Sequence, residues 1–127
     1  MTTNKTLTIL SLIVGTALVV GCSEERRVSF KREVMPILKQ NCVGCHLPPS
    51  SEGFQKSGLS LESYETLMKG TKLGTIIVAG SSLNSSLNRM IEGRVDPSIR
   101  MPHGGKQLPA KDVETMKLWV NQGAKNN

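Results

Sequence analysis

Cys42-Val43-Gly44-Cys45-His46 is the stretch that decides the fold of this 127-residue chain. The pattern Cys-x-x-Cys-His is the attachment signature of a covalent c-type haem. Two thiols at this spacing can form thioethers with the vinyl groups along one edge of a porphyrin, and the adjoining imidazole can coordinate the iron. The pattern therefore predicts Cys42 and Cys45 as thioether sites and His46 as the proximal ligand of one haem c.

Two other kinds of site share part of this pattern. A thioredoxin-like dithiol also has the spacing Cys-x-x-Cys, but it belongs in a βαβ context, and no long hydrophobic strand flanks this one. A zinc site would need a fourth ligand. The candidates left for that role are His103 and the acidic residues.

The N-terminus has the form of an export signal. A short polar segment with Lys5 precedes an apolar run over residues 7–20, which is short for a transmembrane helix and typical of a signal-peptide core. The run ends at Gly21-Cys22, which resembles the bacterial lipobox, where cleavage precedes a cysteine that receives a diacylglyceryl group. We predict a lipoprotein signal peptide over residues 1–21 and lipidation of Cys22; the alternative is a plain signal peptide with Cys22 incidental.

A lipid on Cys22 would decide where the protein resides. Several acyl chains on one residue hold a protein stably on a membrane. Residues 22–28 would then form a polar, lipidated tether to a domain over residues 29–127. We expect an exported protein that faces the periplasm and is anchored to the inner or outer membrane.

The composition after residue 21 limits the possible partners. The remaining 106 residues suffice for one small domain, with 15 basic and 10 acidic side chains. This mild positive charge suits a redox partner protein with an acidic docking surface. No basic run alternates with aromatic residues, so we expect no nucleic acid partner. Four aromatic residues are few for a self-sufficient core, and a porphyrin would supply the missing apolar volume.

Hydrophobic periodicity predicts four short helices. The first covers residues 29–40 and ends at the haem motif, with Pro36 kinking or restarting it. The second is capped by Ser60 and stops at Gly70. The third covers residues 85–92 and the fourth 110–122. Residues 46–53 and 93–109 are predicted loops, and a carbonyl of the first loop is a candidate to hold the second ring nitrogen of His46.

The sixth iron ligand is best supplied by Met101. It lies in the segment Arg100-Met101-Pro102-His103-Gly104-Gly105, outside any predicted helix, and its thioether could reach the iron opposite His46. His103 is the alternative distal ligand. Three other methionines sit at apolar positions of predicted helices, where filling the core is the simpler role, and they are Met68, Met90 and Met116. Met35 lies on the helix before the haem motif, on the proximal side.

The chain resembles the class I c-type cytochromes, and specifically the planctomycete-type cytochrome c domain. The resemblance is carried by Phe30, residues 34–38, 42–46, 58–61 and 67–70, Gly80, residues 86–87 and 101–102, Leu108, and residues 119–124. It implies an all-α, cytochrome c-like fold of about four short helices around one covalently bound haem. It also implies crossed N- and C-terminal helices, here through Phe30 and Trp119, and His46 and Met101 as axial ligands. Ala79 and His103 replace prolines that are common in the family.

These features together predict a membrane-anchored monohaem cytochrome that carries single electrons and is not an enzyme. We expect no small-molecule substrate. The alternative is a haem enzyme or gas sensor, peroxidase-like, with a vacant or displaceable distal site. His103 is the one obvious acid/base group for such chemistry. A weaker possibility is a structural lipoprotein whose haem is incidental.

Overall fold

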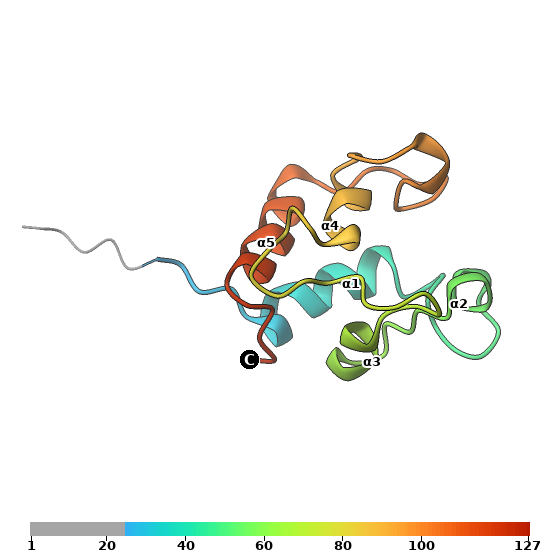
Figure 1. Ribbon diagram of the computed structural model, residues 1–127, viewed down its shortest axis with the longest axis horizontal. Helices are drawn as coiled ribbons and strands as arrows, with labels where there is room; N and C mark the ends of the chain where they lie inside the picture. Colours follow the sequence, from blue (N-terminus) through green and yellow to red (C-terminus); the bar gives the residue numbers. More distant parts are fainter. Residues whose placement is uncertain (1–24) are drawn as a thin grey trace, which may run out of the picture.

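The chain folds as an all-α domain (Figure 1). The structure is a computed structural model that describes residues 25–127. Within this range there is no strand, and the only β-type pairing is an isolated bridge between Thr71 and Gly74. The predicted all-α class is confirmed. The elements are the π-helical turn η1 (Phe30–Val34), α1 (Met35–Asn41), α2 (Glu52–Ser57), α3 (Tyr64–Lys69), α4 (Ser86–Ile91), the 3-10 turn η2 (Pro97–Ile99) and α5 (Ala110–Asn121).

The first helix is built in two parts. Ser29 caps η1 by accepting a hydrogen bond from the Arg32 backbone N–H at 3.3 Å. Pro36 then lies in the first turn of α1, where a missing N–H costs nothing because the groups at a helix start have no intrahelical partner. The sequence-based prediction that Pro36 restarts the helix is confirmed. The helix α1 ends at Asn41, one residue before Cys42.

The first and last helical elements of the described part of the chain are joined by an aromatic cluster. The rings of Phe30 on η1 and Trp119 on α5 have centroids 5.4 Å apart, and Tyr64 meets Phe30 edge-on at 5.2 Å. Edge-to-face and tilted pairs at these distances add to the burial of the rings themselves. The predicted contact between the first and last helices through Phe30 and Trp119 is therefore confirmed.

Three details differ from the sequence-based expectation. Residues 46–53 are not all loop, because α2 begins at Glu52. The cap of α3 is Ser63, whose side chain accepts from the Thr66 N–H while the Thr66 side chain accepts from Ser63, so Ser60 is not the cap and is buried instead. The predicted loop 93–109 contains the turn η2. The predicted helices 85–92 and 110–122 agree with α4 and α5 within one residue at each end.

The predicted signal peptide, the lipidation site Cys22 and the first residues of the tether lie outside the described residues. Between residues 25 and 127, no helix has the length and apolar character needed to cross a membrane.

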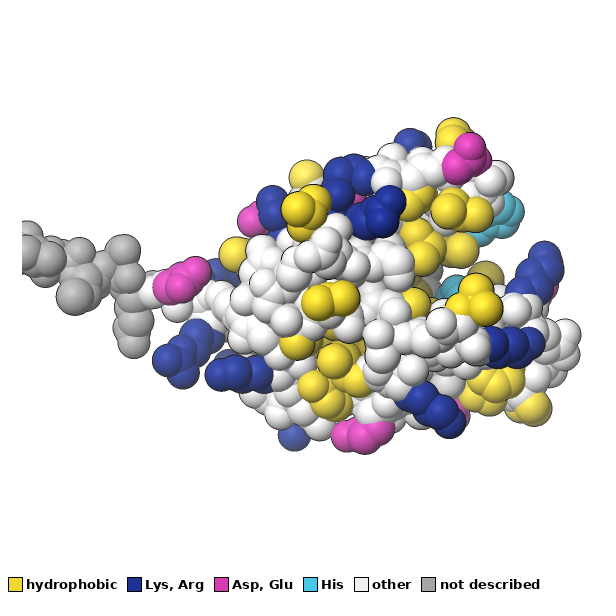
Figure 2. Space-filling view, viewed as in Figure 1, with side chains coloured by type: hydrophobic (Ala, Val, Ile, Leu, Met, Phe, Trp, Pro, Cys, Tyr) yellow, Lys and Arg dark blue, Asp and Glu magenta, His cyan; other side chains and the backbone are white. Residues whose placement is uncertain are grey.

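The surface is hollowed at the end of the molecule away from the N-terminal segment. Figure 2 shows this hollow between the segment that follows α4 and the region around α2, with hydrophobic and histidine side chains lining it. The hollow lies where α1 delivers Cys42 and the residues after it (Figure 1).

Candidate functional site

The Cys-x-x-Cys-His motif forms one tight turn at the end of α1. The Cys42 N–H donates to the Leu38 carbonyl at 2.8 Å, which closes the helix. The N–H groups of Cys45 and His46 both donate to the Cys42 carbonyl at 3.1 Å. These bonds place Cys42, Cys45 and His46 on a single turn of the backbone.

His46 presents one ring nitrogen and buries the other. Its Nδ1 is buried and has no hydrogen-bond partner among residues 25–127, whereas Nε2 is not buried. The His46 carbonyl accepts from the Leu61 N–H at 2.9 Å, which fixes the backbone behind the ring. An imidazole held this way has Nε2 available for a metal.

Burial lowers the pKa of His46, and a smaller effect of the Leu59 backbone opposes this shift. A ligating imidazole must be neutral, so the direction of the shift suits a ligand. Nδ1 has no hydrogen bond within residues 25–127, so a carbonyl of the loop 46–53 as its partner stays a prediction.

Both thiols of the motif are free, and their environments differ. Cys42 is half-buried and packs against the hydrophobic core, and Cys45 is exposed. Burial, and secondarily the charge of Cys45, raise the pKa of Cys42 to about 11. Catalytic dithiols have lowered thiol pKa values. The Cys42 environment therefore argues against a thioredoxin-like dithiol.

A zinc site also lacks support. Nowhere in residues 25–127 do three or more His, Cys, Asp or Glu side chains come together in a group that could hold a metal ion. A structural zinc site needs four such ligands in one place.

Met101 and His103 lie on the other side of the hollow, in the segment after η2. Met101 is half-buried and packs against the hydrophobic core, and its N–H donates to the Met90 carbonyl at 3.3 Å. His103 is exposed. Of the two candidate distal ligands, Met101 is the one directed toward the protein interior.

Glu52 stands at the start of α2 and is exposed. The hydrogen bond and charge of Lys56 lower the pKa of its carboxyl, and the charge of His103 adds a smaller effect in the same direction.

The other methionines of the described residues differ in their burial. Met116 is 1% exposed and belongs to the core, as expected of a helical methionine. Met35 and Met68 are half-buried and pack against the core from outside. Met90, predicted to fill the core, is half-buried, and its carbonyl holds the Met101 backbone.

Gly53 is a site residue that the sequence did not reveal. A Cβ at this position would lie 2.4 Å from the Cys45 carbonyl oxygen and 2.9 Å from Cε1 of His46. The Phe54 N–H also donates to the Cys45 carbonyl at 3.0 Å. The start of α2 therefore packs directly on the haem motif. In the sequence, Gly53 is marked only by being a glycine. It was predicted as the last residue of the loop 46–53, and in the structure it is the second residue of α2.

Comparison with known protein families tests this interpretation. Over residues 42–105 the sequence matches the family described as planctomycete cytochrome C. The match covers half of the chain and includes the motif, both histidines and Met101. The chain belongs to the planctomycete cytochrome C family. No curated protein and no solved structure matches it.

Membership of the planctomycete cytochrome C family makes this chain a c-type cytochrome domain, for which haem c is the general cofactor. The residues present fit that group. Two free thiols share one turn with an imidazole whose Nε2 is open, and the hollow beside them is lined by hydrophobic side chains (Figure 2).

Proposed function

We propose that this protein is a membrane-anchored monohaem cytochrome that carries single electrons. The observation that supports this most strongly is the turn 42–46 at the hydrophobic hollow, with Nδ1 of His46 buried and Nε2 open. Bound haem would supply an iron that cycles between the ferrous and ferric states. The protein would transform no substrate.

Four side chains would hold the haem in this proposal. Each thiol, Cys42 and Cys45, would add across one vinyl group, so that a carbon–sulfur bond forms and the thiol hydrogen goes to the other vinyl carbon. No oxidant is needed for this addition. His46 Nε2 and the Met101 thioether would hold the iron from opposite sides.

Met101 is preferred over His103 as the distal ligand because of their burial. Met101 packs against the core while His103 is exposed, and water must be kept from the iron of an electron carrier. Met/His ligation raises the reduction potential relative to two imidazoles.

The anchor and the partner belong to the same proposal. A diacylglyceryl group on Cys22, after removal of residues 1–21, would hold the protein on the periplasmic face of the inner or outer membrane. The mildly basic domain would exchange electrons with redox proteins that present an acidic docking surface.

Optical spectra of the full-length holoprotein test the ligand assignment. We expect the oxidised protein to show the charge-transfer band of Met-ligated ferric haem, and Met101→Ala to abolish it. Met116→Ala is the matched control, because it removes a buried methionine and should cost about 2–5 kcal/mol of stability while leaving the band intact. A His103→Ala variant should also keep the band.

The same samples separate an electron carrier from a haem enzyme or sensor. A six-coordinate ferrous iron binds carbon monoxide slowly, and we expect rapid binding in Met101→Ala alone. Rapid binding by the unaltered protein would favour the enzyme or sensor. A band that survives in Met101→Ala and disappears in His103→Ala would assign the distal position to His103.

A further inference from the structure

We propose that the end of the domain opposite the hollow is a binding surface for anionic phospholipid headgroups. This surface, called the tether face below, carries five exposed basic residues, which are Arg26, Arg27, Lys31, Arg32 and Lys125. The inference rests on the proposed anchor at Cys22 and adds to it a defined orientation. The tether face would lie on the membrane, and the hollow would point away from it.

The tether face lies at one end of the long axis of the molecule. In Figure 1 the N-terminal segment leaves the domain at the end where α5 finishes, and the hollow is at the other end. Figure 2 shows basic side chains beside the point where the N-terminal segment emerges. A membrane held at this end would therefore leave the hollow accessible to a soluble partner.

The N-terminal segment is fixed to the domain from Val28 onward. Val28, Ser29 and Phe30 are buried. The Val28 N–H donates to Oε1 of Gln122 at 2.8 Å, and Nε2 of Gln122 donates to the Arg26 carbonyl at 2.6 Å. Arg26 and the residues after it thus have a set position on the surface of the domain.

Acidic residues neutralise the tether face only in part. Glu33 forms an ion pair with Arg26 and also accepts from the Ser29 N–H at 2.9 Å. Glu25 lies on the same segment. Hydrogen bonds from its own backbone and from Ser63 lower the pKa of Glu65, and the charge of Lys31 adds a smaller effect in the same direction. Within residues 25–127, four of the five basic side chains have no acidic side chain at ion-pair distance, namely Arg27, Lys31, Arg32 and Lys125.

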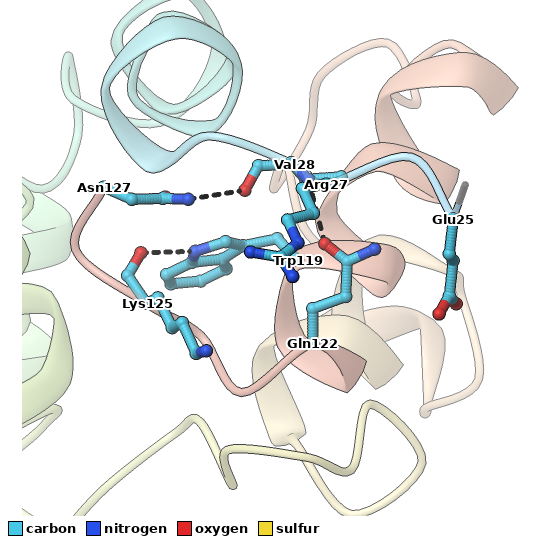
Figure 3. Close-up of a pocket in the computed structure, with 7 residues that line it drawn as sticks. All are labelled: Glu25, Arg27, Val28, Trp119, Gln122, Lys125 and Asn127. Carbon is cyan, nitrogen blue, oxygen red and sulfur yellow. Dashed lines mark hydrogen bonds between the residues drawn. The ribbon is translucent and has the colours of Figure 1, made fainter.

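A cavity of about 350 Å³ lies within the tether face, between the N-terminal segment and the C-terminal tail (Figure 3). Arg27 and Lys125 line it together with Gln122, and Trp119 forms part of its wall. Two cations and an amide around one cavity are suitable donors for a phosphate oxygen. Glu25 also lines the cavity and would reduce, but not cancel, its positive charge.

The position of the anchor favours a lipid over an acidic protein on this face. Six residues separate Cys22 from the buried Val28, and an extended chain of that length spans at most about 20 Å. A lipid on Cys22 would therefore keep the tether face near the headgroups, where each basic residue contributes about 1 kcal/mol on an anionic surface, roughly fivefold in binding. An acidic redox partner has to reach the haem, and the hollow lies at the opposite end.

Chemical labelling of lysines on the full-length holoprotein tests this inference. The protein is reconstituted into vesicles of phosphatidylcholine, with or without phosphatidylglycerol, and acetylation of each lysine is followed by mass spectrometry. We expect phosphatidylglycerol to slow acetylation of Lys31 and Lys125 about fivefold, and high salt to remove the difference. Lys56 on α2 and Lys106 after η2, both near the hollow, should be labelled equally on both lipids.

Variants show whether the charges cause the protection. Arg27→Gln with Arg32→Gln should restore acetylation of Lys31 and Lys125 to the rate on phosphatidylcholine. The matched control, Arg89→Gln with Lys111→Gln, removes two exposed basic residues outside the tether face and should change nothing.

The possible outcomes are distinct. Equal labelling of Lys31 and Lys125 on both lipids, or protection of Lys56 and Lys106 instead, would overturn the inference while leaving an anchor on Cys22 intact. An intact mass without lipid on Cys22 would overturn the anchor. In that case the unlipidated protein is added to preformed vesicles with or without phosphatidylglycerol. We still expect Lys31 and Lys125 to be protected on the vesicles that contain phosphatidylglycerol and not on the others.

Discussion

The contact between Gly53 and His46 shows how closely the haem motif is supported by residues outside it. The turn that holds Cys42, Cys45 and His46 is fixed by its own backbone hydrogen bonds. Its outer side is covered by the first turn of α2, which has room for a glycine and for no larger residue. The orientation of the His46 ring therefore depends on a residue seven positions further along the chain.

We expect Gly53→Ala to reduce haem attachment strongly. The added Cβ would meet the Cys45 carbonyl and the His46 ring at 2.4 and 2.9 Å, so the turn or α2 must move. Overpacking of this kind typically costs about 1–3 kcal/mol. Gly44→Ala is the matched control within the motif, because a Cβ there meets nothing within 4 Å. The measurement is the haem-to-protein ratio of the purified proteins, and equal ratios would contradict the role given to Gly53.

At the residue scale, the sequence predicted the site residues that belong to a motif with fixed spacing. It missed the residues whose role depends on contacts between distant segments. The pattern Cys-x-x-Cys-His has a fixed chemical meaning, so its residues could be identified from the sequence alone. Gly53 acts through a close approach between two segments, and no local pattern encodes such an approach. Met101 could be singled out because it lies in a loop, where a methionine has no helical face to fill.

Among the elements, the C-terminal tail and η1 form a clasp through one residue. Oδ1 of Asn127 accepts from the Phe30 N–H at 2.8 Å, and its Nδ2 donates to the Val28 carbonyl at 3.2 Å. The Asn127 carbonyl accepts from the Lys31 N–H at 2.9 Å. The clasp covers the contact between Phe30 and Trp119, which joins the first and last helices.

We expect Asn127→Ala to lower the free energy of unfolding by about 1–3 kcal/mol, because it leaves the buried Phe30 N–H without a partner. Denaturation of the holoprotein with guanidinium measures the change. The neighbouring Asn126 is exposed and donates to Glu65 at 3.2 Å, so Asn126→Ala should change stability by less than about 0.5 kcal/mol. Equal losses in the two variants would show that the clasp has no special role.

The helices with clear periodicity were predictable, and the short or polar ones were not. The first and last helices have apolar residues at helical spacing, and both were placed within one residue at each end. The helix α2 has six residues, one of them a glycine, and no buried side chain, so it presents no periodic signal. Ser60 and Ser63 are equally plausible caps by residue type. The structure selects Ser63 because Thr66 completes its hydrogen bonds.

The whole molecule has a packed core beside the hollow. The surface of the hollow itself is apolar and only partly covered. Seventeen buried apolar residues form one cluster that includes Phe30 and Trp119. Residues of both walls are only half-buried against this cluster, among them Cys42, Val43 and Met101. A bound porphyrin would cover these side chains, so folding and haem attachment should be linked in this protein.

We expect the variant Cys42→Ala with Cys45→Ala, which cannot attach haem, to keep its helices and lose its cooperative unfolding. The core around Trp119 can persist, but the walls of the hollow would face water without a partner, as in a molten globule. Far-ultraviolet circular dichroism should change little, the near-ultraviolet signal of Trp119 should fall, and heating should give a broad, gradual loss of structure in place of the sharp transition of the holoprotein. Gly44→Ala alters the same turn but leaves both thiols, and it should melt like the holoprotein. A haem-free variant with an unchanged, two-state transition would show that the seventeen-residue core is sufficient without the porphyrin.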